Sequence, residues 1–127
     1  MLFFPVLRTG YFKFAVDWKE QFKGAVVTGY PGAILGGKVI EAAYGDLVPL
    51  SPALNIVSIK HGQIKFTQGS SGGVWVANFS GQQNDTTNIA ISLTSFGSQS
   101  SPGLSFGPYF TSDFKRLLEY TSKGCPK

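Results

Sequence analysis

The most specific signal in this sequence is Thr67-Gln68-Gly69-Ser70-Ser71-Gly72-Gly73-Val74-Trp75. Small residues on both sides of Ser71 allow the backbone to make a tight turn that presents the serine hydroxyl. Acyl transfer at a serine requires an exposed hydroxyl and backbone N–H groups that converge on the developing oxyanion. Taken alone, the stretch also fits a flexible turn, so its surroundings decide between these two interpretations.

Short apolar runs, separated by Gly, Pro, Ser or Asn-Asp, surround this stretch. They predict six strands, at residues 24–29, 38–43, 54–60, 63–66, 74–78 and 88–95. Strands at this spacing are typical of a small antiparallel barrel, and closing the sheet removes its exposed edges. We therefore expect an all-β, six-stranded antiparallel β-barrel. The residues expected to be mostly buried in it are Val26, Ile56, Trp75, Ile89 and Ile91.

The two ends of the chain flank the expected barrel differently. Residues 1–23 alternate aromatic and polar groups, which predicts one strand, and residues 97–107 are rich in Ser, Gly and Pro and predict a long loop. After Thr111 or Ser112, apolar residues recur at helical spacing, so we expect a C-terminal α-helix near 113–122, packed outside the barrel. Its residues expected to be mostly buried are Phe114, Leu117 and Leu118.

Composition bounds the class of protein. A chain of 127 residues that is 43% hydrophobic can bury one core, and its net charge of +4 comes from thinly spread basic residues. Nucleic-acid binding would require a basic cluster, and a transmembrane helix about 20 apolar residues, so we expect neither nucleic acid nor a membrane as partner. Cys125, the single cysteine, allows no intrachain disulfide, and no metal or cofactor is expected.

The first residues, 1–7, form a poor signal peptide, because they contain a proline and have no basic residue ahead of the apolar stretch. The compartment is therefore undetermined, and secretion of a full-length form is one alternative.

The region around Ser71 resembles the nucleophile motif of chymotrypsin-like (trypsin-like) serine peptidases, Gly-Asp-Ser-Gly-Gly-Pro. It is more similar to the Gly-Ser-Ser-Gly-Gly-Pro-Trp form of their glutamyl-endopeptidase-like subgroup. Residues 26–32, Val-Val-Thr-Gly-Tyr-Pro-Gly, resemble a strand and turn early in that subgroup's second barrel. Residues 88–97 resemble the strand that ends in Ser-Trp-Gly and lines the substrate cleft, and residues 114–121 resemble the C-terminal helix. The resemblance covers roughly residues 24–122.

The resemblance implies a set of site residues. Ser71 would be the nucleophile, and the N–H groups of Gly69 and Ser71 would form the oxyanion hole. The substrate-binding residues would be Lys65, Phe66 and Thr94 around the primary specificity pocket, and Ser95, Phe96 and Gly97 along an edge that binds an extended peptide by strand addition. Core packing is the alternative role for Phe66.

Several residues depart from the family pattern. Ser70 replaces the aspartate that pairs with a newly cut N-terminus in trypsin-type zymogens, so that activation switch is not expected. Thr67 replaces a disulfide cysteine, and Val74 replaces a proline. Lys65 stands where trypsin-like enzymes have an acid, which argues against cleavage after Lys or Arg. Thr94 stands where glutamate-specific members have a histidine, so cleavage specificity is undetermined.

The general base is the larger departure. Family members place the catalytic histidine and its aspartate in a first barrel, ahead of everything in this chain. His61 is the one histidine and does not match the catalytic one, so a surface or turn role is expected for it. Asp17 lies too near the Gly-Tyr-Pro segment to be the triad aspartate. A serine without a base is a weak nucleophile, so we expect the chain to be inactive by itself.

The favoured hypothesis is therefore the C-terminal half of a serine endopeptidase, which hydrolyses peptide bonds through an acyl-enzyme on Ser71. Residues 24–127 would be the C-terminal barrel with its helix, and residues 1–23 a remnant of the junction with a missing first barrel. Expected partners are an extended peptide or protein substrate and that first barrel. One alternative is a non-catalytic peptide- or protein-binding β-barrel module. Another is an unrelated β-rich interaction domain whose Gly-Ser tract is only a turn.

Overall fold

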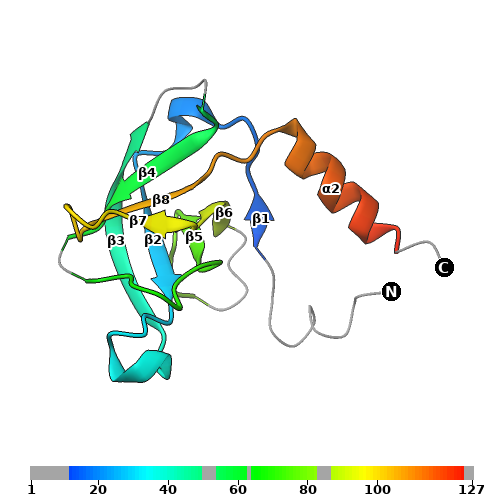
Figure 1. Cartoon of the computed structure of the whole chain (residues 1–127). Helices are drawn as coiled ribbons and strands as arrows, with labels where there is room; N and C mark the ends of the chain where they lie inside the picture. Colours follow the sequence, from blue (N-terminus) through cyan, green and yellow to red (C-terminus); the bar gives the residue numbers. More distant parts are fainter. Residues whose placement is uncertain (1–11, 50–53, 63, 83–86, 125–127) are drawn as a thin grey trace.

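The chain folds into a strongly curled β-sheet with one helix at its side (Figure 1). The computed structural model describes residues 12–49, 54–62, 64–82 and 87–124. This mostly-β architecture with a C-terminal helix confirms the expected fold class at that level. None of the described helices is long and apolar enough to cross a membrane.

Eight strands make up the sheet in the described part of the chain. They are β1 Lys13–Phe14, β2 Gly24–Gly29, β3 Glu41–Pro49, β4 Ile56–Lys60, β5 Val74–Ala77, β6 Ile89–Leu93, β7 Phe96–Gly97 and β8 Leu104–Pro108. Their order across the sheet is β1-β6-β5-β2-β3-β4-β8-β7. All neighbours are antiparallel except β1 and β6, which are parallel, so the sheet is mixed.

The expected closed six-stranded barrel is wrong as to closure. Closing the observed sheet would require a ladder between β6 and β8, but β1 pairs along one side of β6 and β7 pairs along one side of β8. These short strands occupy the edges that would otherwise meet. The two strands still lie close together, and the Ser92 hydroxyl donates to the Pro108 carbonyl at 2.8 Å. The sheet is thus curled but open.

The strand predictions hold unevenly. Strands are present within the expected 24–29, 54–60, 74–78 and 88–95, whereas the one expected at 38–43 begins at Glu41 and continues to Pro49. Residues 64–66 form no strand, although Phe66 belongs to the core cluster. The expected loop at 97–107 contains most of β8, which pairs with β4 over its whole length. In the N-terminal region, residues 1–11 lie outside the described part and the predicted strand is only β1.

The core lies inside the curl. It consists of the buried residues Trp18, Ala25, Val27, Val57, Ile59, Phe66, Trp75, Ala77 and Ile91. Trp75 and Ile91 are fully buried as expected, whereas Ile56 and Ile89 are half-buried. Val26 is also only half-buried, because Ala25 and Val27 face the core and side chains alternate along a strand.

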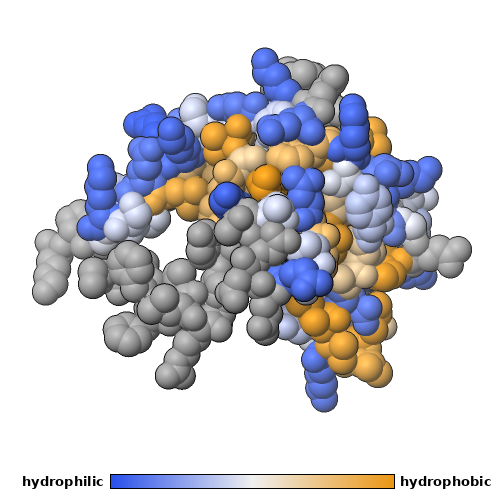
Figure 2. Space-filling model, turned by 180° about the vertical axis from the view of Figure 1, so that it is seen from behind, coloured by the Kyte–Doolittle hydropathy of each residue, from blue (hydrophilic) through white to orange (hydrophobic). Residues whose placement is uncertain are grey.

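One end of the molecule is apolar on its surface. The segment between β2 and β3 includes the short 3-10 helix η2, Leu35–Gly37, and exposes the large side chains of Leu35, Val39 and Ile40. It forms the orange region at the lower right of Figure 2.

A second 3-10 helix, η1, spans Lys19–Gln21 and leads into β2.

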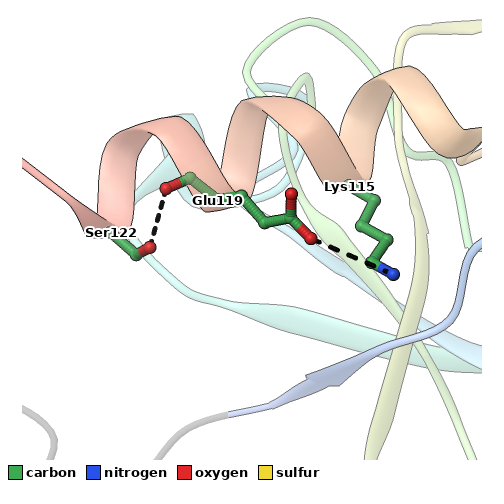
Figure 3. Close-up of polar contacts among 3 residues, drawn as sticks. All are labelled: Lys115, Glu119 and Ser122. Carbon is green, nitrogen blue, oxygen red and sulfur yellow. Dashed lines mark hydrogen bonds and ion pairs between the residues drawn. The ribbon is translucent and has the colours of Figure 1, made fainter.

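The C-terminal helix, α2 Ser112–Ser122, begins after Thr111 as predicted and is followed by Gly124 at φ +79°. A glycine at positive φ is a common way to end a helix. The ion pair between Lys115 and Glu119 (3.9 Å) and the bond from the Ser122 hydroxyl to the Glu119 carbonyl (2.8 Å) both lie along the helix itself (Figure 3).

The expectation that Phe114, Leu117 and Leu118 are mostly buried is wrong for Leu117. None of its residues is buried, and Leu117 is 55% exposed. Phe114 and Leu118 are half-buried. In the described part of the chain the aromatic packing of α2 is made by Phe114, whose ring stacks on that of Phe110 with centroids 4.0 Å apart. Helical spacing identifies an apolar face, but it does not provide a surface for that face to cover.

Candidate active site at Ser71

Two consecutive β-turns form the glycine- and serine-rich segment. The Ser70 N–H donates to the Thr67 carbonyl, and the Gly73 N–H donates to the Ser70 carbonyl, each at 3.0 Å. The third residue of each turn is a glycine at positive φ, Gly69 at +96° and Gly72 at +82°. This combination defines two type II turns, which require glycine at that place. The sequence therefore folds here as its glycine spacing dictates.

Ser71 is the second residue of the second turn and is exposed. The turn is attached to the segment after β6 by two bonds: the Gly72 N–H donates to the Thr94 carbonyl, and the Thr94 N–H donates to the Gly73 carbonyl, both at 2.8 Å. These bonds bring Ser71 beside the start of the 95–97 segment, although more than 20 residues separate them in sequence.

A cleft of about 440 Å³ opens at this place. Ser71 lines it together with all six predicted substrate-binding residues, which are Lys65, Phe66, Thr94, Ser95, Phe96 and Gly97. Sequence reasoning missed part of the lining, namely Ser98, Gln99 and Pro102, because that segment was expected to be a featureless loop. The candidate nucleophile and the candidate binding residues therefore share one surface.

The two inner residues of the cleft also serve the core. Phe66 is 7% exposed and belongs to the core cluster, so the alternative role in packing holds for it as well. Thr94 is 5% exposed, and its hydroxyl accepts a bond of 2.9 Å from the Trp75 indole N–H. Both side chains are fixed by packing, which gives the cleft a rigid floor.

The outer wall of the cleft is an edge strand. β7 is the last strand in the sheet order, so in the described part of the chain no strand covers its outer side. Ser95 donates its N–H to the Phe106 carbonyl at 2.8 Å, and the Phe96 ring stacks on that of Phe106 with centroids 4.7 Å apart. One side of β7 pairs with β8, and its other side has no strand partner among the described residues. Addition of a peptide strand requires such a free edge.

The two candidate oxyanion donors are free. Neither the Gly69 N–H nor the Ser71 N–H has a hydrogen-bond partner among the described residues. The neighbouring N–H groups of Ser70 and Gly72, by contrast, are both bonded within the protein. Two unpaired backbone donors therefore lie on either side of residue 70, next to the exposed hydroxyl of Ser71.

His61 is not where a surface or turn role would place it. It is 4% exposed, its Nε2 forms a 2.9 Å hydrogen bond with the Ser105 hydroxyl, and its ring meets that of Phe66 edge-on at 4.9 Å. Burial lowers the pKa of His61 below its ordinary value. The structure brings its ring to Ser105 and not to the cleft, so the expectation of exposure is wrong.

Other groups that could take part in chemistry are remote from the cleft or ungrouped. Asp17 is exposed, does not line the cleft, and has its N–H bonded to the Phe110 carbonyl at 2.8 Å. Over residues 12–49, 54–62, 64–82 and 87–124, His, Cys, Asp and Glu do not gather in any group of three that could hold a metal ion. The chemistry that this site can support is therefore that of a serine hydroxyl beside free backbone donors.

The fold is similar to that of solved serine proteases. A thermostable serine protease, AL20, from an extremophilic microorganism matches with a TM-score of 0.68 and 26% sequence identity, over 88% of this chain and 48% of that chain. The protease Anisep from Arthrobacter nicotinovorans matches with a TM-score of 0.66 and 22% identity, over 87% of this chain and 48% of that chain.

These matches show the fold of a chymotrypsin-like serine protease, in a chain that spans about half the length of the proteases it matches. No protein-family model matches the chain, and no curated protein does.

Proposed function

We propose that this chain is the C-terminal half of a serine endopeptidase with Ser71 as its nucleophile. The observation that carries the proposal is the exposed Ser71 on a type II turn, sharing a cleft with an uncovered edge strand in a fold similar to serine proteases. The Ser71 oxygen would attack the scissile carbonyl carbon while its proton passes to a base. The amine would leave with a proton, and water would then hydrolyse the serine ester.

The base must come from outside the described residues. His61 is bonded to Ser105 and does not line the cleft that holds Ser71, so it is not proposed as the base. A first barrel, in the same protein or in a second chain, would supply a histidine and its orienting aspartate. Because a serine hydroxyl is a weak nucleophile without a base, the isolated chain is proposed to be inactive.

The proposed substrate is an extended peptide paired along β7. Backbone pairing reads no side chain, so the pocket would determine selectivity. Lys65 is the one charged residue among the described residues that line the cleft, and its charge would repel a Lys or Arg side chain of the substrate. The proposed ancestry is the glutamyl-endopeptidase-like subgroup. Thr94 in place of that subgroup's histidine leaves the preferred residue open.

A non-catalytic peptide-binding module is the second candidate. The observation that favours it is the bonding of His61 to Ser105, which leaves Ser71 without a base in the described part of the chain. It would use the same cleft and the same edge. The two candidates differ in whether a completed protein reacts at Ser71.

The test is labelling with a fluorophosphonate. We expect none in the isolated chain, and labelling of Ser71 once the protein includes a histidine-bearing barrel encoded upstream of Met1 or added as a separate chain. The label should be lost in Ser71→Ala and kept in Ser122→Ala, a remote exposed serine on α2. Labelling that persists in Ser71→Ala would refute the nucleophile. Peptide binding with no labelling of the completed protein would favour the binding module.

A further inference from the structure

The peptide between Gln68 and Gly69 is held by a hydrogen bond from another segment of the chain. The Gly32 N–H donates to the Gln68 carbonyl at 2.7 Å. The C=O and N–H of a trans peptide point in opposite directions, and none of the described peptide bonds is cis. A bond that draws the Gln68 carbonyl toward Gly32 therefore turns the Gly69 N–H away from Gly32.

The same four residues, 67–70, could form another turn. In a type I turn the central peptide is rotated by roughly half a turn, and the third residue has a φ of about −90° instead of a positive value. The Gln68 carbonyl would then point where the Gly69 N–H points in the observed turn. Gly69 has a φ of +96°, which is the type II form. The bond from Gly32 is compatible with this form only.

The contact between the two segments depends on two glycines. A Cβ on Gly32 would lie 2.9 Å from the Gln68 carbonyl oxygen, and a Cβ on Gly69 would lie 2.5 Å from the Tyr30 carbonyl oxygen. A second bond joins the same segments nearby, since the Ala33 N–H donates to the Thr67 hydroxyl at 3.1 Å. The 30–33 segment is thus packed directly against the turn, and none of its residues lines the cleft.

The side chain of Ser70 does not hold the turn. Ser70 is 1% exposed, and its hydroxyl has no hydrogen-bond partner among the described residues. The Ser70 side chain therefore does not fix the turn, and the bond from Gly32 is the one that reaches its central peptide from another segment in the described part of the chain.

We propose that Gly32 is a positioning residue, whose N–H holds the 68–69 peptide so that the Gly69 N–H is offered to the oxyanion. The oxyanion hole is then preformed, and no ion pair at position 70 is needed. This inference rests on the proposed function for its catalytic meaning, but its structural content can be measured in the isolated chain.

The structural test uses NMR spectroscopy of the isolated chain. Wild type should show a scalar coupling across the hydrogen bond from the Gly32 nitrogen to the Gln68 carbonyl carbon, with Gly69 at positive φ. Gly32→Pro deletes the donor, so the coupling should be lost and Gly69 should move to negative φ. Thr67→Val is the matched control, because it removes only the neighbouring bond from Ala33 and should keep both signals.

Each outcome of these measurements supports or overturns the positioning role of Gly32. A wild type without the coupling, or a folded Gly32→Pro that keeps Gly69 at positive φ, overturns the proposal. If Gly32→Pro does not fold, Gly32→Ala replaces it, since the added methyl would crowd the Gln68 carbonyl oxygen at 2.9 Å. If neither variant folds, the wild-type coupling and φ decide.

The effect on catalysis is measured in the protein that includes the histidine-bearing first barrel. Gly32→Pro should lower kcat by about 100-fold to 1,000-fold, the usual loss for one oxyanion donor, with KM unchanged. Leu35→Ala is the control, because Leu35 lies in the same segment and is 72% exposed. If the NMR results are as expected but no form hydrolyses substrate, then the proposed function fails and the positioning role of Gly32 stands.

Discussion

The Ser92 hydroxyl donates a 2.8 Å hydrogen bond to the Pro108 carbonyl and so links β6 to β8, two strands that share no backbone ladder. Ser92 is fully buried. The two strands face each other across the opening of the curled sheet. In a closed barrel, backbone hydrogen bonds would join them there, and in this structure the Ser92 side chain provides a bond in their place. Mutation of Ser92 can therefore test whether this bond stabilises the curled sheet.

Replacing Ser92 by alanine should destabilise the fold. The variant removes one buried hydrogen bond, so we expect the free energy of unfolding to fall by about 1 kcal/mol, measured by urea denaturation. Ser122→Ala is the control, since that hydroxyl is exposed on α2. A change in Ser92→Ala no larger than in the control would mean that the opening of the sheet is not held at this point.

Gly107 tests the same closure by crowding. A Cβ at this position would lie 2.1 Å from the Leu93 carbonyl oxygen and 2.3 Å from the Ser92 hydroxyl. Gly107→Ala should therefore push β8 away from β6 and lower the free energy of unfolding by about 1–3 kcal/mol. Gly97→Ala on β7 is the matched control, because its Cβ would meet only contacts of 3.7 Å. Equal stabilities of the two variants would contradict the close approach of β6 and β8.

The parts of the fold that could be predicted are those fixed locally. The turns around Ser71 follow from glycines that must adopt positive φ, and the end of α2 follows from Gly124. Thr111 precedes the helix as predicted, but its side chain makes no capping bond. β8 could not be predicted, because Leu-Ser-Phe-Gly-Pro has the composition of a loop and becomes a strand only by pairing with β4. The prediction of a closed barrel was wrong for a similar reason, because closure depends on which strands β1 and β7 pair with.

The candidate site divides in the same way. The residues that share the cleft with Ser71 were predicted by resemblance, because their order along the chain is that of a known motif. The burial of His61 was not, because it depends on Ser105, which is 44 residues away in sequence. The contact of Gly32 with Gln68 likewise joins separate segments. It is a bond between backbone groups, so the identity of the side chains does not predict it.

The attachment of α2 gives a third prediction. The Phe114 ring stacks on that of Phe110 and lies 5.5 Å from that of Phe14, whereas Leu117 is 55% exposed. Phe114→Ala should free the helix from the sheet, so its amides should exchange hydrogen faster, as isolated helices of this length are marginal in water. Leu117→Ala on the same helix should leave exchange nearly unchanged. Faster exchange in Leu117→Ala alone would show that α2 is held by another face.

The last prediction concerns pH. Burial disfavours the protonated form of His61 in the folded protein and so lowers the pKa of the imidazole below its ordinary value. In the unfolded chain the same group takes up a proton as the pH falls through about 6.5. Between those two pKa values the unfolded state binds more protons than the folded state, so stability increases with pH there. The stability that neutral His61 contributes is thus fully present above pH 6.5 and is lost as the pH falls toward the folded pKa.

His61 is the sole histidine, so this dependence can be assigned to it. We expect the urea midpoint of the wild type to fall between about pH 7 and pH 5, the range in which histidine ordinarily titrates. His61→Gln keeps a polar side chain that can reach the Ser105 hydroxyl but does not titrate, so its midpoint should stay level over the same range. Ser105→Ala should retain the slope, because it removes the bonding partner and leaves the buried imidazole. A level wild-type profile, or a slope that survives in His61→Gln, would show that protonation of His61 does not oppose folding.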